Sequence, residues 1–113
     1  MNLDALKNLK DGWYDGEGLA PKDEDVDWLK KCVDKYYKSD LPAYYVYPTP
    51  EGNVVIEWCI GNNNISLDIN FTDKHGWFHC WNSVTDEENS EYLFLDKDEY
   101  WNRLIELIET YMK

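Results

Sequence analysis

The sequence has little of what a disulfide-stapled or membrane-spanning protein needs. Its 113 residues contain three cysteines, an odd number without C-x-x-C spacing, so we expect no disulfide framework. No apolar stretch approaches the length that spans a bilayer, and the N-terminal run MNLDALKNLK has no apolar signal core. We therefore expect a cytoplasmic protein without membrane contact, folded as one domain over residues 1–113.

Basic residues are also scarce. Lys and Arg number 11 against 23 Asp and Glu, which gives a formal net charge of −12. The imbalance is steeper after residue 56, where 12 acids face 4 bases, than before it, where 11 acids face 7. Nucleic acids and anionic membranes reward clusters of Lys and Arg, so this charge argues against direct binding to either. It favours a basic protein partner; the alternative is that it only keeps the protein soluble.

Residues that carry enzyme chemistry are few. Only two histidines occur, and the chain has no phosphate-binding loop, dinucleotide fingerprint or Ser-His-Asp order. We predict no cofactor and no enzymatic activity. One alternative stays open: Glu57, Asp68 and His79 converge on one sheet face and bind a divalent cation, as in a metal-dependent hydrolase.

Two segments before residue 42 have helical periodicity. Leucines repeat every three residues from Leu3 to Leu9, and Gly12 is placed as the C-cap of this first helix. A second helix is expected to begin near Asp23–Asp25, because carboxylates suit the positive end of a helix dipole, and to end before Leu41.

The middle of the chain changes to a period of two, which is typical of strands. Short turns separate the first four of these segments, so we predict an antiparallel meander. The expected strands are Ala43–Tyr47, Val54–Ile60, Ile65–Thr72, Trp77–Asn82 and Glu91–Leu95.

A final helix is expected to begin near Asp96 or Asp98, with an apolar stripe that includes Trp101, Leu104 and Ile108. The order of the segments then predicts an α+β fold. It is a four- or five-stranded antiparallel meander sheet packed with two N-terminal helices and one C-terminal helix.

The sheet face turned away from the core is the candidate binding surface. With turns of even length, Glu57 is expected opposite Asp68 and Asp68 opposite Trp81, with Tyr44 and Val46 on the same outer face. Facing carboxylates repel unless a cation offsets them, and exposed tryptophans form a patch that soluble monomers seldom leave bare. The alternative is that another element folds over this face. The predicted partner-binding residues are Glu57, Asp68, Trp77, His79, Trp81, Asp86, Glu87 and Glu88.

The run GWYDGEG at residues 12–18 combines three glycines with two aromatic and two acidic residues. Calcium binding is disfavoured, because the acids lack the D-x-D-x-D-G spacing. We interpret the run as structural: its glycines turn the chain sharply toward the second helix, and Trp13 or Tyr14 fills the core.

Two longer segments carry a resemblance to a known family. They are GWYDGEGLAP at 12–21 and YPTPEGNVVIEW at 47–58, followed by the strand Leu67–Ile69. Over most of its length the chain resembles a family of small, largely uncharacterised bacterial proteins with the motifs W-D-G-x-G-A-P and P-T-P-E-G-G-V-x-x-E-W and an L-E-I-like strand. It departs from that pattern at Tyr14, an extra residue, and at Asn53, where glycine is common. The resemblance implies a shared α+β fold and assigns no activity or site residue.

These observations predict a non-enzymatic acidic binding protein that docks on a basic partner. One form of it is an inhibitor or antitoxin-like protein that neutralises a basic nucleic-acid-acting protein by imitating phosphate charge. The alternatives are the metal-dependent hydrolase and a structural subunit of a larger assembly.

Overall fold

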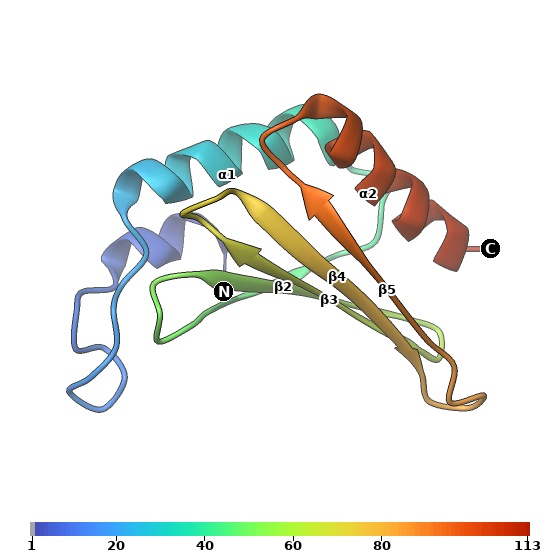
Figure 1. The fold of residues 1–113 in the computed structure, drawn as a ribbon, viewed down its shortest axis with the longest axis horizontal. Coiled ribbons are helices and arrows are strands. Elements are labelled where there is room, and N and C mark those ends of the chain that lie inside the picture. Colours follow the sequence, from blue (N-terminus) through green and yellow to red (C-terminus); the bar gives the residue numbers. More distant parts are fainter. Residues whose placement is uncertain (1) are drawn as a thin grey trace.

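The computed structural model describes residues 2–113 as an α+β fold in two layers (Figure 1). Five antiparallel strands form one sheet in chain order, so each strand pairs with the next, and the helices all lie on one side of it (Figure 1). The elements are η1 (Asp4–Asn8), α1 (Asp23–Tyr36), β1 (Tyr45–Pro48), β2 (Val54–Ile60), β3 (Asn63–Asn70), β4 (His75–Asn82), β5 (Glu88–Phe94) and α2 (Asp98–Tyr111).

The first predicted helix is a 3₁₀ helix of five residues, so the fold has two α-helices and η1 rather than three α-helices. The leucine period of three matches the three residues per turn of a 3₁₀ helix, and Leu3 and Leu6 are both buried. The prediction that Gly12 caps this helix is wrong. The chain leaves it in extended conformation at Leu9, and Gly12 lies in the next loop with a φ of 89°.

Both α-helices occupy the predicted positions. The first turn of α1 carries three acidic residues, as the helix dipole favours, and the helix buries Val26, Leu29 and Val33. On α2 the predicted Trp101, Leu104 and Ile108 are buried, whereas Met112 lies beyond the helix and is exposed.

Polar contacts fix α2 against the sheet and α1. The buried indole Nε1 of Trp101 donates a hydrogen bond of 2.7 Å to the carbonyl oxygen of Leu95, just after β5. Arg103 donates two hydrogen bonds of 2.9 Å, one to each carboxylate oxygen of Glu91 on β5. At the first residue of α2, the hydroxyl group of Tyr36 donates to Asp98. These contacts hold the N-terminal half of α2 against the sheet and α1.

The strand register differs from the predicted one by an even number of residues. The β2–β3 turn has two residues, Gly61 and Asn62, rather than four, and places Glu57 opposite Ser66. Asp68 pairs with Trp77 rather than with Trp81. Because side chains alternate with a period of two, an even slip keeps every residue on its predicted face. The predicted core residues of β2 to β4 are accordingly buried, namely Val54, Ile56, Trp58, Ile65, Leu67, Ile69, Phe78 and Cys80.

The first strand is placed on the wrong face by the sequence prediction. Val46 is fully buried opposite Ile56, and Tyr44 packs against the core, whereas Tyr45 and Tyr47 are exposed. The loop of residues 49–53 between β1 and β2 has five residues. An odd loop reverses the alternation that even turns would produce, so the two faces of β1 exchange.

The GWYDGEG segment is a small hairpin rather than a core plug. Tyr14 and Glu17 pair across the turn residues Asp15 and Gly16, which have φ values of 51° and 86°. Such positive φ angles are those of a two-residue hairpin turn and explain the glycine. The prediction that an aromatic residue here fills the core is wrong: Tyr14 is 54% exposed, and Trp13 donates from its Nε1 to the carbonyl oxygen of Leu19 over 2.8 Å.

Candidate partner-binding face

The strands present a second face on the side opposite the helices (Figure 1), which we call the open face. Its residues alternate along each strand with the buried ones and lie beside one another across the sheet through the pairing register. The open face comprises Tyr45, Tyr47, Val55, Glu57, Cys59, Asn64, Ser66, Asp68, Asn70, His75, Trp77, His79, Trp81, Glu88, Ser90, Tyr92 and Phe94.

Large aromatic side chains on this face are exposed to solvent. The exposed fractions are 53% for Tyr45, 46% for Tyr47, 37% for Trp81, 57% for Tyr92 and 49% for Phe94. Isolated apolar residues on a surface are ordinary, but several large rings on one sheet face form a patch of the kind that marks an interaction site. The alternative expectation, that another element folds over this face, is wrong for the described part of the chain.

The open face is acidic and carries no Lys or Arg to balance it. Between residues 45 and 94 there are eight acids and a single base, Lys74. That lysine lies in the β3–β4 turn, with Nζ 5.5 Å from the ring centroid of Trp28 on α1, and so belongs to the helix side. The open face itself holds Glu57, Asp68 and Glu88. Most acids lie elsewhere on the molecule, so the distinctive property of this face is its lack of Lys and Arg.

Two of the three carboxylates lie directly across a strand pair from a tryptophan. Asp68 on β3 pairs with Trp77 on β4, and Trp81 on β4 pairs with Glu88 on β5. The ring of Trp77 packs against the ring of Tyr92, with ring centroids 4.3 Å apart and an interplanar angle of 50°. Paired residues of neighbouring strands have Cβ atoms about 5 Å apart, so each carboxylate lies beside a ring.

One contact to the β4–β5 loop and one contact between β4 and β5 lie at the end of this face. The indole Nε1 of Trp81 donates a hydrogen bond of 2.8 Å to Asp86 Oδ1. His79 Nε2 lies 3.8 Å from Glu88 Oε1.

Among the described residues, Glu57 and Asp68 form no ion pair. These two carboxylates are therefore free to accept a cation from outside the molecule.

A shallow hollow of 270 Å³ lies on the open face across β2, β3 and β4. Glu57, Cys59, Ser66, His79 and Trp81 are among the residues that line it. The row Glu57, Ser66 and His79 crosses β2, β3 and β4 at its floor. The hollow mixes a ring, a carboxylate and an imidazole, and its size suits one side chain of a partner.

Six of the eight predicted partner-binding residues share the open face: Glu57, Asp68, Trp77, His79, Trp81 and Glu88. Asp86 and Glu87 lie in the β4–β5 loop at its end, where Asp86 holds Trp81.

Sequence reasoning missed four aromatic residues of this face, Tyr45, Tyr47, Tyr92 and Phe94. On β1 the two tyrosines lie on either side of Val46, which is buried. Assigning the apolar Val46 to the core would have placed both tyrosines on the open face. On β5 the apolar residues Tyr92, Leu93 and Phe94 are consecutive, and a run of this kind has no alternation that would show which ring faces outward.

The predicted metal set is not assembled. Ser66 separates Glu57 from His79, which puts two strand spacings of about 5 Å each between them. Asp68 lies in another row, between Val55 and Trp77. Within residues 2–113 no group of three His, Cys, Asp or Glu side chains is arranged to hold a metal ion.

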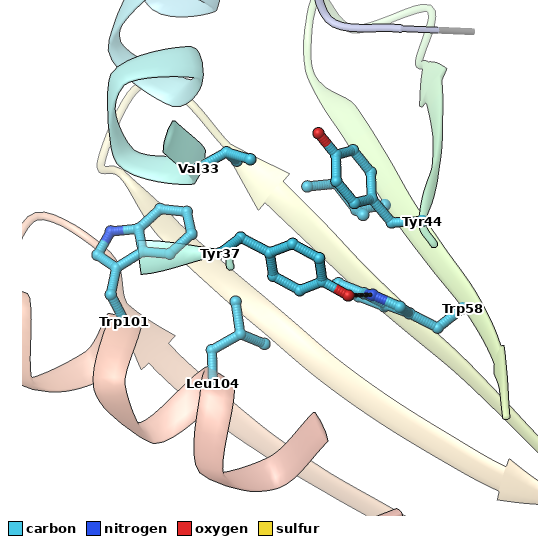
Figure 2. A pocket seen from close by; sticks show the side chains of 7 residues that line it. Val33, Tyr37, Tyr44, Trp58, Trp101 and Leu104 are labelled. Carbon is cyan, nitrogen blue, oxygen red and sulfur yellow. Dashed lines mark hydrogen bonds between the residues drawn. The ribbon is translucent and has the colours of Figure 1, made fainter. Parts of the chain in front are cut away.

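The core contains a cavity of only 10 Å³, lined mainly by aromatic and apolar residues of α1, α2 and β2 (Figure 2). At its edge the Nε1 of Trp58 donates a hydrogen bond of 2.9 Å to the hydroxyl group of Tyr37, which in turn donates to the carbonyl oxygen of Pro42 (Figure 2 shows the first bond). Burial raises the pKa of Tyr37. This cavity is too small for a ligand, and its polar groups serve the packing.

No protein-family model, curated protein or solved structure matches the chain in the comparisons with known proteins. In the part of the chain that the structure describes, no helix is both long and apolar enough to cross a bilayer.

Proposed function

We propose that this protein is a non-enzymatic binding protein whose open face docks on a basic protein partner. The observation that carries the proposal is the composition of that face: exposed aromatic rings share it with Glu57, Asp68 and Glu88, and no Lys or Arg lies among them. Aromatic residues are favoured at the centres of interfaces, and complementary charge steers a partner to its place. A partner that brings Lys or Arg to this face satisfies both features.

The charge of the face selects among the possible occupants. Phosphate groups of nucleic acid and anionic lipids would meet three carboxylates without a compensating Lys or Arg. A second copy of the chain would present the same three carboxylates, so pairing through this face repels. A basic protein surface is the occupant that charge complementarity favours.

A concrete form of this function is inhibition. Proteins that act on nucleic acids carry basic surfaces for phosphate. An acidic face that covers such a surface blocks access of the nucleic acid by occupying its binding site. In this form the protein is an inhibitor or antitoxin-like neutraliser of a basic nucleic-acid-acting protein.

The test compares capture of host proteins by three versions of the chain at low and high salt. The face variant carries Glu57→Lys and Asp68→Lys. The control carries Asp34→Lys and Glu109→Lys, exposed positions near the helix C-termini, where the dipole favours a lysine. Both variants change the net charge equally, from −12 to −8, because each of two substitutions replaces one negative charge with one positive charge.

We expect basic proteins to be retained by the unaltered chain and by the control, and to be lost from the face variant. Retention should weaken as salt rises, because the Debye length falls from about 10 Å at 0.1 M to about 3 Å at 1 M. Equal retention by all three versions, retention that salt does not weaken, or capture of no basic protein would contradict the proposal.

A further inference from the structure

The two carboxylate–tryptophan pairs of the open face indicate which basic side chain it recognises. In each pair a carboxylate residue and a tryptophan occupy facing positions of two neighbouring strands: Asp68 with Trp77, and Glu88 with Trp81. A cation bound at either pair contacts a negative charge and an aromatic surface together. Two contacts fix the positions of these rings: Trp77 packs against Tyr92, and the Trp81 indole donates a hydrogen bond to Asp86.

The two basic side chains differ in how they use such a pair. The guanidinium group of arginine is planar and weakly hydrated, stacks on aromatic rings, and donates two parallel hydrogen bonds to one carboxylate. The ammonium group of lysine is a compact, strongly hydrated charge without a flat surface to stack. We propose that the open face selects arginine rather than lysine side chains of its partner, an inference that rests on the proposed function.

The distance between the pairs sets a spacing for the arginines. Trp77 and Trp81 are four residues apart on β4, and a strand rises about 3.3 Å per residue, so the pairs lie roughly 13 Å apart. An extended segment of the partner has the same rise. Two arginines four residues apart in such a segment reach both pairs.

The test uses two probes of equal length and charge, deca-arginine and deca-lysine. Their affinities are measured by calorimetry at low salt, and the indole N–H signals of Trp77 and Trp81 are followed by NMR, assigned from W77F and W81F. We expect deca-arginine to bind about fivefold more tightly, because arginine adds ring stacking and a bidentate hydrogen bond to the cation–π attraction that lysine also has. We also expect it to shift the signals of these two tryptophans more than those of the other four.

Variants separate this selectivity from general attraction between opposite charges. W77A/W81A removes the rings and keeps the carboxylates, whereas D68N/E88Q removes the carboxylates with almost no change of shape. The first should reduce the arginine preference to less than about twofold. The second should reduce it as well, and remains informative if the first folds poorly. Y14A removes an exposed ring outside the open face and should keep the preference.

The outcomes distinguish the two proposals. Equal affinity of the two peptides, with both weakened by Glu57→Lys and Asp68→Lys, would overturn arginine selection and leave docking of a basic partner in place. An arginine preference that persists in W77A/W81A would also overturn it. Peptide binding that no open-face variant alters would overturn both.

Discussion

Replacing Tyr37 by Phe tests whether the aromatic core depends on one buried hydrogen-bond relay. The indole Nε1 of Trp58 donates to the Tyr37 hydroxyl group over 2.9 Å, and Trp58 is only 2% exposed. The same hydroxyl group donates to the carbonyl oxygen of Pro42. Y37F keeps the ring and removes the oxygen, which leaves a buried N–H group without an acceptor. A buried polar group left unsatisfied costs about 1–3 kcal/mol, so we expect a loss of that size in the free energy of unfolding.

The matched control is Tyr44→Phe. The Tyr44 ring packs edge-on against Tyr37, with centroids 5.3 Å apart, but among the described residues its hydroxyl group makes no hydrogen bond. Y44F should therefore change the free energy of unfolding by less than about 0.5 kcal/mol.

Urea unfolding followed by tryptophan fluorescence measures both variants. With an m-value of about 1–3 kcal/mol/M, Y37F should lower the midpoint by roughly 0.3–3 M with m unchanged. An effect of Y37F below about 0.5 kcal/mol, or an equal effect of Y44F, would refute the relay as the source of stability.

Further predictions concern an ion pair, the orientation of the sheet and the packing beneath the helices. Arg103 holds the pKa of Glu91 below its usual range, so the pair stabilises the fold at neutral pH and this contribution disappears as the pH falls through the lowered pKa. E91Q should cost about 0.5–1 kcal/mol at pH 7 and nothing at pH 2, measured by urea unfolding at both values; an equal cost at pH 2 would count against the pair. A thiol reagent should label Cys59 in the native protein and Cys80, which is 2% exposed, only on unfolding, and fast native labelling of Cys80 would show that the sheet faces are inverted. G76A should lower stability by about 1–3 kcal/mol, because its methyl group would lie 2.7 Å from a buried leucine side chain; a thermal midpoint equal to that of the unaltered protein would contradict this packing.

Much of the fold follows from patterns that are local in the sequence. Three local patterns each predict one element. They are the acidic start of α1 at Asp23, the apolar stripe on α2 around Leu104, and the alternation of apolar and polar residues in β3. Their burial is set within a few residues, so short windows of sequence predict them. The first helix was predicted as an α-helix, and this was wrong because a period of three also fits a short 3₁₀ helix.

The open face shows the limit of such windows. Predicted face assignments held for β2, β3 and β4, because the true register is displaced by an even number of residues. They failed at β1, where the five-residue loop at 49–53 exchanged the two faces and brought Tyr45 and Tyr47 outward. The length of this loop decided that Tyr45 and Tyr47 join the candidate site.

The sequence by itself determined the charge, the order of helices and strands, and which face most strands bury. These properties depend on composition and on local periodicity, both of which can be read along the chain. Only the tertiary structure decided that Asp68 lies opposite Trp77 and Glu88 opposite Trp81. Cross-strand neighbours depend on turn geometry and on the packing of distant elements, and no local pattern encodes them.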